Sequence, residues 1–297
     1  MDQASRHDER LLVGALSLIV VFMALEVAVA LVSHSLALLS DAGHMVTDAG
    51  ALLAAIGAAR LAARPARGVW TYGLKRAEIL AAAGNGVALL VIAALVCFEA
   101  VLRLMHPPAV QGTAVLTVAL AGVAVNLGAT FLLARASRTS LNVEGAFQHI
   151  VTDLLAFVAT AIAGVVLMTT GFRRADSIAS LVVVVLMVRA SYRLLGESGR
   201  VLLEAAPANV GLADVRAHML AVPHVSEVHD LHIWTLTSDL PAVSAHVVVD
   251  DCCFVENHAP RVLDDLQACL VGHFDVEHST FQLEASGHAE HETGGHA

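Results

Sequence analysis

Long uninterrupted apolar stretches dominate the first two thirds of the chain. A helix needs about 20 residues to cross the hydrocarbon core of a bilayer. Five long stretches and a sixth, shorter one are of this order, and they lie at 11–33, 36–59, 77–102, 113–134, 146–170 and 177–195. The apolar core of the sixth ends at Arg189 and Arg193, whose long side chains can reach the membrane surface. The pattern predicts an all-α bundle of six transmembrane helices over residues 11–200.

After residue 200 the pattern changes to short apolar runs mixed with charged residues and histidines. Alternating positions, interrupted by three prolines, predict a helix, two strands, a helix and a strand at 210–221, 225–236, 242–249, 258–272 and 276–283. This αββαβ order predicts a small α+β domain over residues 207–286, with helices on one face of the sheet. Residues 287–297 are polar, Gly-rich and contain His, and we expect a disordered tail.

Basic residues are concentrated on one side of the predicted bundle. That side carries Arg6, Arg10, Arg60, Arg64, Arg67, Lys75, Arg76, Arg135, Arg138, Arg193 and Arg200, whereas the other carries Arg103, Arg173 and Arg174. Loops rich in Lys and Arg stay in the cytoplasm. We therefore expect a multi-pass protein of the cell (inner) membrane, with residues 1–10, the C-terminal domain and both termini in the cytoplasm.

Composition and charge agree with a membrane protein. The chain is 57% hydrophobic and 15% charged, with a mean hydropathy of +0.71, which exceeds the apolar content of an ordinary soluble domain. The net charge of −10 leaves no basic surface for nucleic acid, so that class of partner is excluded. The four cysteines form no spaced disulfide framework, which suits the reducing cytoplasm.

Two predicted spans each contain a His/Asp pair. His44 and Asp48 lie four residues apart in the second span, and His149 and Asp153 repeat this spacing in the fifth. One such pair alone is more simply explained as a helix-stabilising hydrogen bond. Its recurrence favours a shared site, because ionisable residues inside a membrane are rare and mark ion pathways. Two imidazoles and two carboxylates form a tetrahedral, charge-neutralising shell of the kind that zinc prefers.

Other polar residues lie in the predicted spans. Asp41 precedes the first pair by one turn, and we expect it to support a ligand or to lie at the interface. For Asn85 and Asn126 we expect hydrogen bonds between helices rather than metal ligation. The role of Glu26 stays open. The small residues of 81–86 allow neighbouring helices to approach closely.

Four segments together resemble the cation diffusion facilitator family, in particular its zinc-efflux branch. They are SHSLALLSDAGHMVTD, YGLKRAEILAA, EGAFQHIVTDLLA and VHDLHIWTLT, and the resemblance extends over nearly the whole chain. It implies a homodimer of six-helix protomers with a metallochaperone-like (ferredoxin-like) cytoplasmic domain that exchanges cytoplasmic zinc for protons. It also implies that His44, Asp48, His149 and Asp153 are the transport ligands, in agreement with their spacing.

The resemblance implies further sites outside the membrane. His229, His246 and His278 match family ligands for a structural or regulatory zinc ion in the C-terminal domain, and His258 is a weaker match. Arg76 and Glu204 match an ion pair that holds a hinge between the membrane and the domain.

The other candidate ligands of the C-terminal domain are disfavoured by the sequence. Strand alternation predicts His232 on the face opposite His229. Cys252, Cys253 and Glu284 are disfavoured as ligands, because adjacent cysteines rarely aim at one ion and a glutamate can cap a strand edge. His218, His224 and His273 are expected to be solvated surface residues, and the same holds for His232.

These features predict a secondary transporter that exports divalent metal, most simply zinc, by proton antiport. Cadmium, cobalt, iron and manganese stay open as main substrates, because a shell of two His and two Asp tolerates several ions. A membrane-anchored metal-sensing receptor is the alternative. An intramembrane zinc hydrolase would need an HExxH motif, which the sequence lacks, so we expect neither enzymatic activity nor a cofactor.

Overall fold

The chain folds into two compact units, Met1–Ser198 and Gly199–Ala297, in a computed structural model. The structure describes residues 3–33, 36–106, 112–136, 140–237, 240–255, 257–274, 276 and 278–288. Within the helices, the side chains of residues 3–7, 26, 29–33, 36–48, 112, 114 and 115 lie outside the described part.

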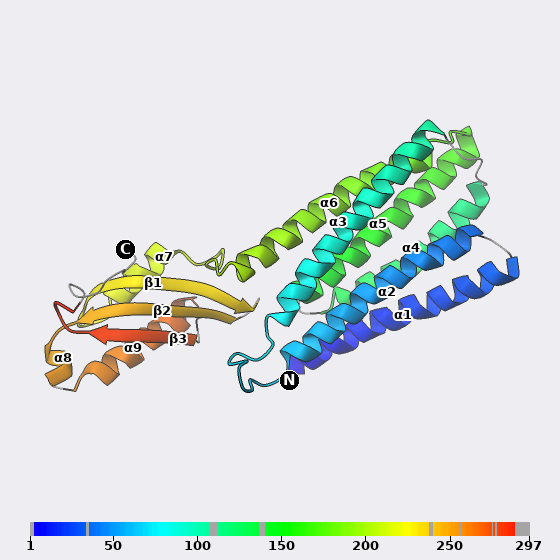
Figure 1. The fold of residues 1–297 in the computed structure, drawn as a ribbon. Coiled ribbons are helices and arrows are strands. Elements are labelled where there is room, and N and C mark those ends of the chain that lie inside the picture. Colours follow the sequence, from blue (N-terminus) through cyan, green and yellow to red (C-terminus); the bar gives the residue numbers. More distant parts are fainter. Residues whose placement is uncertain are drawn as a thin grey trace. The chain divides into compact units, whose positions relative to one another are not determined.

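Six long helices build the N-terminal unit in the described part of the chain. They are α1 (Gln3–Ser33), α2 (Leu36–Ala62), α3 (Ala77–Met105), α4 (Gly112–Leu133), α5 (Leu141–Thr170) and α6 (Ala175–Leu202). Successive helices run in alternating directions (Figure 1). Among the described residues, four segments are long and apolar enough to span a bilayer, namely Ala77–Met105, Leu116–Leu133, Leu141–Thr170 and Ala175–Leu202. The predicted helical membrane bundle is confirmed.

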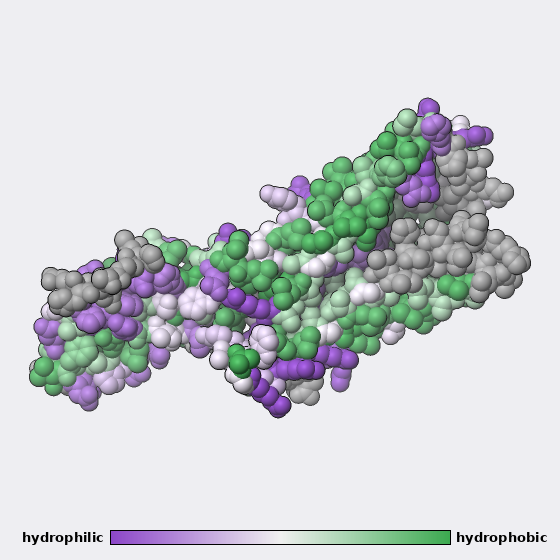
Figure 2. Space-filling model, in the orientation of Figure 1, coloured by the Kyte–Doolittle hydropathy of each residue, from purple (hydrophilic) through white to green (hydrophobic). Residues whose placement is uncertain are grey.

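Large apolar side chains cover the outside of these helices. Leu95, Phe98 and Val185 are about two-thirds exposed, and Figure 2 shows hydrophobic residues along the length of the helical unit. A soluble protein rarely exposes a continuous apolar surface of this extent, because contact with water is unfavourable. The surface is therefore suited to lipid, and the protein is a membrane protein.

The helices extend beyond the apolar stretches that predicted them. Helix α1 begins at Gln3, inside the segment expected to precede the bundle, and α5 begins at Leu141 rather than at residue 146. Helix α6 continues to Leu202 instead of ending near residue 195. Once a helix is nucleated, each further residue adds one hydrogen bond at low cost, so it continues past the hydrocarbon layer.

Two apolar clusters hold the bundle together. One joins α1, α2, α4 and α5 through buried residues such as Leu12, Leu52, Leu133 and Ile150. The other joins α3 and α6 through Leu89, Ala93, Val183, Val184 and Met187. Small residues allow the close approach of α3 and α6, since a Cβ on Gly86 would lie 2.9 Å from Leu195 Cγ. The Ser191 hydroxyl donates to the Gly86 carbonyl at 2.6 Å across the same contact.

The C-terminal unit has the predicted αββαβ order, with one additional short helix. Its elements are α7 (Leu212–Leu220), β1 (Val225–Thr237), β2 (Leu240–Val249), α8 (Cys252–Val255), α9 (Ala259–Phe274) and β3 (His278–Glu284). The strand order is β1-β2-β3, with β1 and β2 antiparallel and β2 and β3 parallel. Helices α7 and α9 pack against Val243, Ala245 and Val247 on one face of the sheet. The fold prediction is confirmed here as well.

A β-bulge in β1 overturns the alternation expected for His232. His229 pairs with His246, and His232 pairs with Ser244, so three steps on β1 correspond to two on β2. Residues that differ by two positions on β2 share a face. The extra residue of the bulge therefore returns His232 to the face of His229, and the prediction of opposite faces was wrong. Asp230, inside the bulge, has a left-handed φ of 48°.

Candidate metal centres

Helix α5 presents one His/Asp pair in the interior of the bundle. The His149 side chain is 3% exposed and that of Asp153 is 19% exposed, and His149 Nε2 lies 3.6 Å from Asp153 Oδ2. The two residues are one helical turn apart, so their side chains lie on the same face of α5. A neutral imidazole and a carboxylate at this separation can bind one cation between them.

A buried hydrogen bond joins α5 to α2 near one end of both helices. Asn142 is 3% exposed, and its Nδ2 donates to the Ala55 carbonyl at 2.8 Å. Beside this bond, Leu52 and Ile56 of α2 pack in the same apolar cluster as Ala146 and Ile150 of α5. The two helices run in opposite directions (Figure 1). The Asn142–Ala55 bond therefore fixes how far one helix is shifted along the other.

The same bond relates the two His/Asp pairs. Asp48 and His44 precede Ala55 by 7 and 11 residues, and His149 and Asp153 follow Asn142 by 7 and 11 residues. In two antiparallel helices, equal counts from one contact reach equal depths, at about 1.5 Å per residue. Residue 48 thus lies level with residue 149, and residue 44 with residue 153. The side chains of His44 and Asp48 lie outside the described part, as do those of Asp41 and Glu26.

The two asparagines of the third and fourth spans behave differently. Asn85 Nδ2 of α3 donates to the Gly145 carbonyl of α5 at 2.9 Å, which is the expected bond between helices. Asn126 is 3% exposed, and its Nδ2 donates at 3.1 Å to the Gly122 carbonyl of its own helix α4. Its hydrogen bond is therefore intrahelical, because a side-chain amide can reach back one turn to a carbonyl.

A second group of donors lies on the sheet face away from α7 and α9. His229, His246 and Glu284 each offer a ligand atom, and these atoms all lie within 4.8 Å of one another. Glu284 Oε1 is 2.7 Å from His246 Nδ1, and Glu284 Oε2 is 3.5 Å from His229 Nε2. The Glu284 side chain is only 1% exposed. Two imidazoles and one carboxylate match the ligand preferences of zinc and leave a fourth position open.

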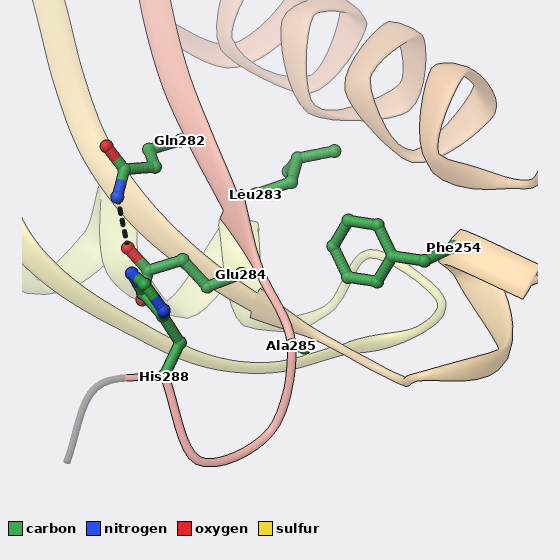
Figure 3. Close-up of a pocket in the computed structure, with 6 residues that line it drawn as sticks. All are labelled: Phe254, Gln282, Leu283, Glu284, Ala285 and His288. Carbon is green, nitrogen blue, oxygen red and sulfur yellow. Dashed lines mark hydrogen bonds between the residues drawn. The ribbon is translucent and has the colours of Figure 1, made fainter. Parts of the chain in front are cut away.

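A pocket of about 240 Å³ adjoins Glu284. Phe254, Gln282, Leu283, Ala285 and His288 complete its lining (Figure 3). Gln282 Nε2 donates to Glu284 Oε1 at 2.9 Å, which orients the carboxylate. On the other side of the centre, Asp230 Oδ2 lies 3.9 Å from His246 Nε2. Such supporting polar groups hold ligands in place at metal sites.

The structure does not bring His278 to this group within one chain. His278 pairs with Ala242, whereas Gln282 pairs with His246, so His278 is displaced along β3 by four residues. Four residues of strand correspond to about 13 Å. His258 is also elsewhere, with its ring centroid 6.0 Å from that of His224.

The predicted hinge residues belong to different units. Arg76 directly precedes α3. Glu204 follows α6 with a left-handed φ of 59°. The ion pair between them stays a prediction.

Glu284 is a candidate ligand that the sequence analysis disfavoured. Its position at the end of β3 resembled a strand cap, because the sequence does not reveal that β3 adds parallel to β2. The observed register places Glu284 beside Val248, one residue pair beyond the partner of Leu283. The sequence did contain one indication of this position. Residues two apart on a strand share a face, so Glu284 lies on the same face as Gln282, which pairs with His246.

Two family models match the chain and together cover most of it. The "Cation efflux transmembrane domain" matches residues 12–203, and the "Cation efflux protein, cytoplasmic domain" matches residues 207–286. A solved structure, "Metal-bound C-terminal domain of the CzcD transporter" from Cupriavidus metallidurans, is 43% identical, covers 25% of this chain and 99% of that chain, and gives a TM-score of 0.23.

Three curated proteins illustrate the similarity. The "Cadmium, cobalt and zinc/H(+)-K(+) antiporter" of Bacillus velezensis is 35% identical over 77% of this chain and 73% of its own length. The "Metal cation efflux system protein CzcD" of Cupriavidus metallidurans is 38% identical over 75% and 70%. The "Zinc transporter ZitB" of Escherichia coli is 36% identical over 76% and 71%.

Proposed function

The chain belongs to the cation diffusion facilitator family, and from that premise we propose that it exports divalent metal, with zinc as main substrate, in exchange for protons. The observation that carries this proposal is the buried His149–Asp153 pair on α5, at the depth of His44 and Asp48 on α2. The relatives named for zinc, cadmium and cobalt transport fit the same assignment. Iron and manganese are less favoured, because the shell contains two nitrogen donors.

In the proposed site the two aspartates neutralise the charge of the metal ion, and the two histidines exchange metal for protons. Two carboxylates, Asp48 and Asp153, neutralise a divalent cation in the low dielectric of the bundle. Two imidazoles, His44 and His149, bind the cation only when they are neutral. Protons therefore compete with zinc for the site, and an acidic exterior favours release whereas a more alkaline cytoplasm favours loading. This competition is the physical basis of the proposed antiport.

The orientation proposed for the membrane follows from the distribution of basic residues. The protein lies in the cell (inner) membrane with both termini in the cytoplasm, since its Arg- and Lys-rich segments flank the ends of α2, α4 and α6. In this orientation the C-terminal unit is in contact with cytoplasmic metal ions. It can therefore respond to an excess of metal in the cytoplasm, which export would lower.

The sheet centre is proposed as a regulatory metal site in a homodimer. His229, His246 and the buried Glu284 fit a zinc ion, as their ligand atoms all lie within 4.8 Å of one another. Binding there would stabilise one arrangement of the cytoplasmic units and thereby raise transport when cytoplasmic zinc is high. His278, expected as a further ligand of the same site, lies on the same sheet face but four residues along β3 from Gln282, and the proposed centre does not include it.

Metal flux into proteoliposomes under a pH gradient tests the proposal. Zinc uptake and coupled proton movement are measured for the wild type, for Asp153→Asn and for Asp176→Asn. Asp176 is a control because it lies in the first turn of α6, 35% exposed, 3.8 Å from Arg103. We expect zinc-dependent proton movement in the wild type and in Asp176→Asn, and none in Asp153→Asn.

Three other outcomes would contradict the proposal. Equal flux in all three proteins would exclude the pair as the transport site. Metal binding without flux in the wild type would instead support a membrane-anchored receptor, and zinc uptake that ignores the pH gradient would exclude proton antiport.

A further inference from the structure

Three segments of the C-terminal unit meet beyond the end of the β1–β2 pair. Val225 of β1 pairs with Val249 of β2, so the residues just outside this pair, His224 and Asp250, are neighbours. The Asp250 amide donates to the His224 carbonyl at 3.0 Å. The chain then turns into α8, where the Cys253 amide donates to the Asp250 carbonyl at 2.9 Å. The His258 amide in turn donates to the Cys253 carbonyl at 2.9 Å. These backbone bonds fix the three segments.

This corner gathers one imidazole and two thiols. His224, Cys252 and Cys253 each offer a ligand atom, and these atoms all lie within 4.8 Å of one another. Both cysteines are free of disulfides. Adjacent residues on a strand point to opposite faces, whereas adjacent residues on a helix are only about 100° apart. Because α8 begins at Cys252, both thiols reach the same side, which the general expectation for adjacent cysteines did not anticipate.

The arrangement is close to the dimensions of a metal shell. Zinc–sulfur bonds of about 2.3 Å and zinc–nitrogen bonds of about 2.0 Å place tetrahedral ligand atoms about 3.5 to 4 Å apart. The present spacing requires an inward movement of about 1 Å, which the exposed side chains of His224 and Cys252 can make, while the fully buried Cys253 stays fixed. The His258 ring is a further imidazole at this corner, with its centroid 6.0 Å from that of His224.

Two features near the corner favour a ligand role for His224. Its Nδ1 lies 3.1 Å from Asp250 Oδ2, and a metal-bound histidine commonly donates its other ring N–H to a carboxylate. The backbone of His224 also has a left-handed φ of 71°, a conformation that is uncommon for residues other than Gly. The His224 ring thus lies beside Asp250, and its ligand atom lies within 4.8 Å of those of Cys252 and Cys253 on α8.

We propose that His224, Cys252 and Cys253 form a second cytoplasmic cation site, separate from the His229–His246–Glu284 centre and specific for thiophilic ions such as cadmium and zinc. Thiolates bind soft cations more strongly than carboxylates do, so this site favours cadmium relative to the sheet centre. His229 pairs with His246, whereas His224 neighbours Asp250, four residues further along the chain. Four residues of strand correspond to about 13 Å, so the two centres bind separate ions.

Cadmium titration of the full-length protein in detergent tests the proposal. Bonds between thiolates and cadmium give an ultraviolet charge-transfer band that carboxylate and imidazole ligands do not give. We expect the band in the wild type, in Cys269→Ser and in Glu284→Gln, and its loss or halving in Cys252→Ser. Cys269 is the matched thiol control, because it lies on α9 of the same unit and burial raises the pKa of its thiol, which keeps it protonated. Asp250→Asn should weaken cadmium binding about 10- to 100-fold.

A second measurement needs no variant and so is independent of folding defects. Alkylation of Cys252 in the wild type is followed by peptide mass spectrometry with cadmium, with magnesium and without added metal. We expect cadmium, and not magnesium, to protect Cys252. The proposal is overturned if Cys252 reacts at one rate in all three conditions, or if the band persists in Cys252→Ser and disappears in Cys269→Ser. Neither measurement involves transport, so both results are independent of the proposed export activity.

Discussion

Replacing Asn142 by Ala removes the hydrogen bond that sets the depth of α2 against α5. The bond is 2.8 Å long and the residue is 3% exposed, so no water replaces the lost partner. Hydrogen bonds between membrane helices contribute about 0.6 kcal/mol on average and up to about 1.7 kcal/mol. If the bond belongs to the metal-loaded arrangement, its whole energy supports zinc binding. The half-saturating zinc concentration should then rise about threefold to eighteenfold.

Asn126→Ala is the matched control for this variant. Asn126 has the same chemistry and the same 3% exposure, but its amide donates to the Gly122 carbonyl of its own helix α4 rather than to a neighbouring helix. Zinc uptake by proteoliposomes over a range of zinc concentrations gives the half-saturating value for each variant, and thermal unfolding in detergent reports any general loss of stability. The reasoning is refuted if Asn142→Ala leaves the half-saturating concentration unchanged, or if Asn126→Ala raises it equally.

Two further substitutions, each with a control variant, test the sheet centre and the helix packing. Glu284→Gln should weaken zinc binding by the C-terminal unit and abolish the stimulation of flux by cytoplasmic zinc. Glu227 is exposed, so Glu227→Gln should change neither property. Calorimetry measures the binding and a flux assay measures the stimulation, and equal behaviour of the two variants would contradict the regulatory proposal. Gly122→Ala should lower the melting temperature, since the added carbon meets the Phe157 ring and overpacking costs about 1 to 3 kcal/mol. Gly57→Ala, with no described atom within 4 Å of the added carbon, should leave the melting temperature unchanged or slightly higher, and equal losses in both variants would exclude the packing argument.

The membrane part of the fold was predictable because its signals are local. Spans of apolar residues, and an i, i+4 pair such as His149 and Asp153, depend only on the helical period and on the cost of burying charge. The depth relation between α2 and α5 was not predictable, because the Asn142–Ala55 bond joins residues 87 positions apart. Sequence reasoning supplied the candidates for that site, and their relative depth came from a long-range contact.

The C-terminal unit was harder because its sites depend on strand register. Alternation failed at the bulge near Asp230, where one extra residue changes the face of every later side chain. Glu284 joined His229 and His246 only through the parallel addition of β3. Cys252 and Cys253 were disfavoured because adjacent cysteines rarely aim at one ion, whereas they lie in a short helix and their ligand atoms approach each other.

The Asn142–Ala55 bond also sets a rule for insertions and deletions in this protein. An added residue between positions 44 and 55, or between 142 and 153, would shift the donors beyond it by about 1.5 Å and turn them by about 100° relative to the bond. Such a change would separate the two His/Asp pairs although every side chain in them was kept. Functional relatives should therefore vary in residue type within these two segments while keeping their lengths, and should differ in length only outside them.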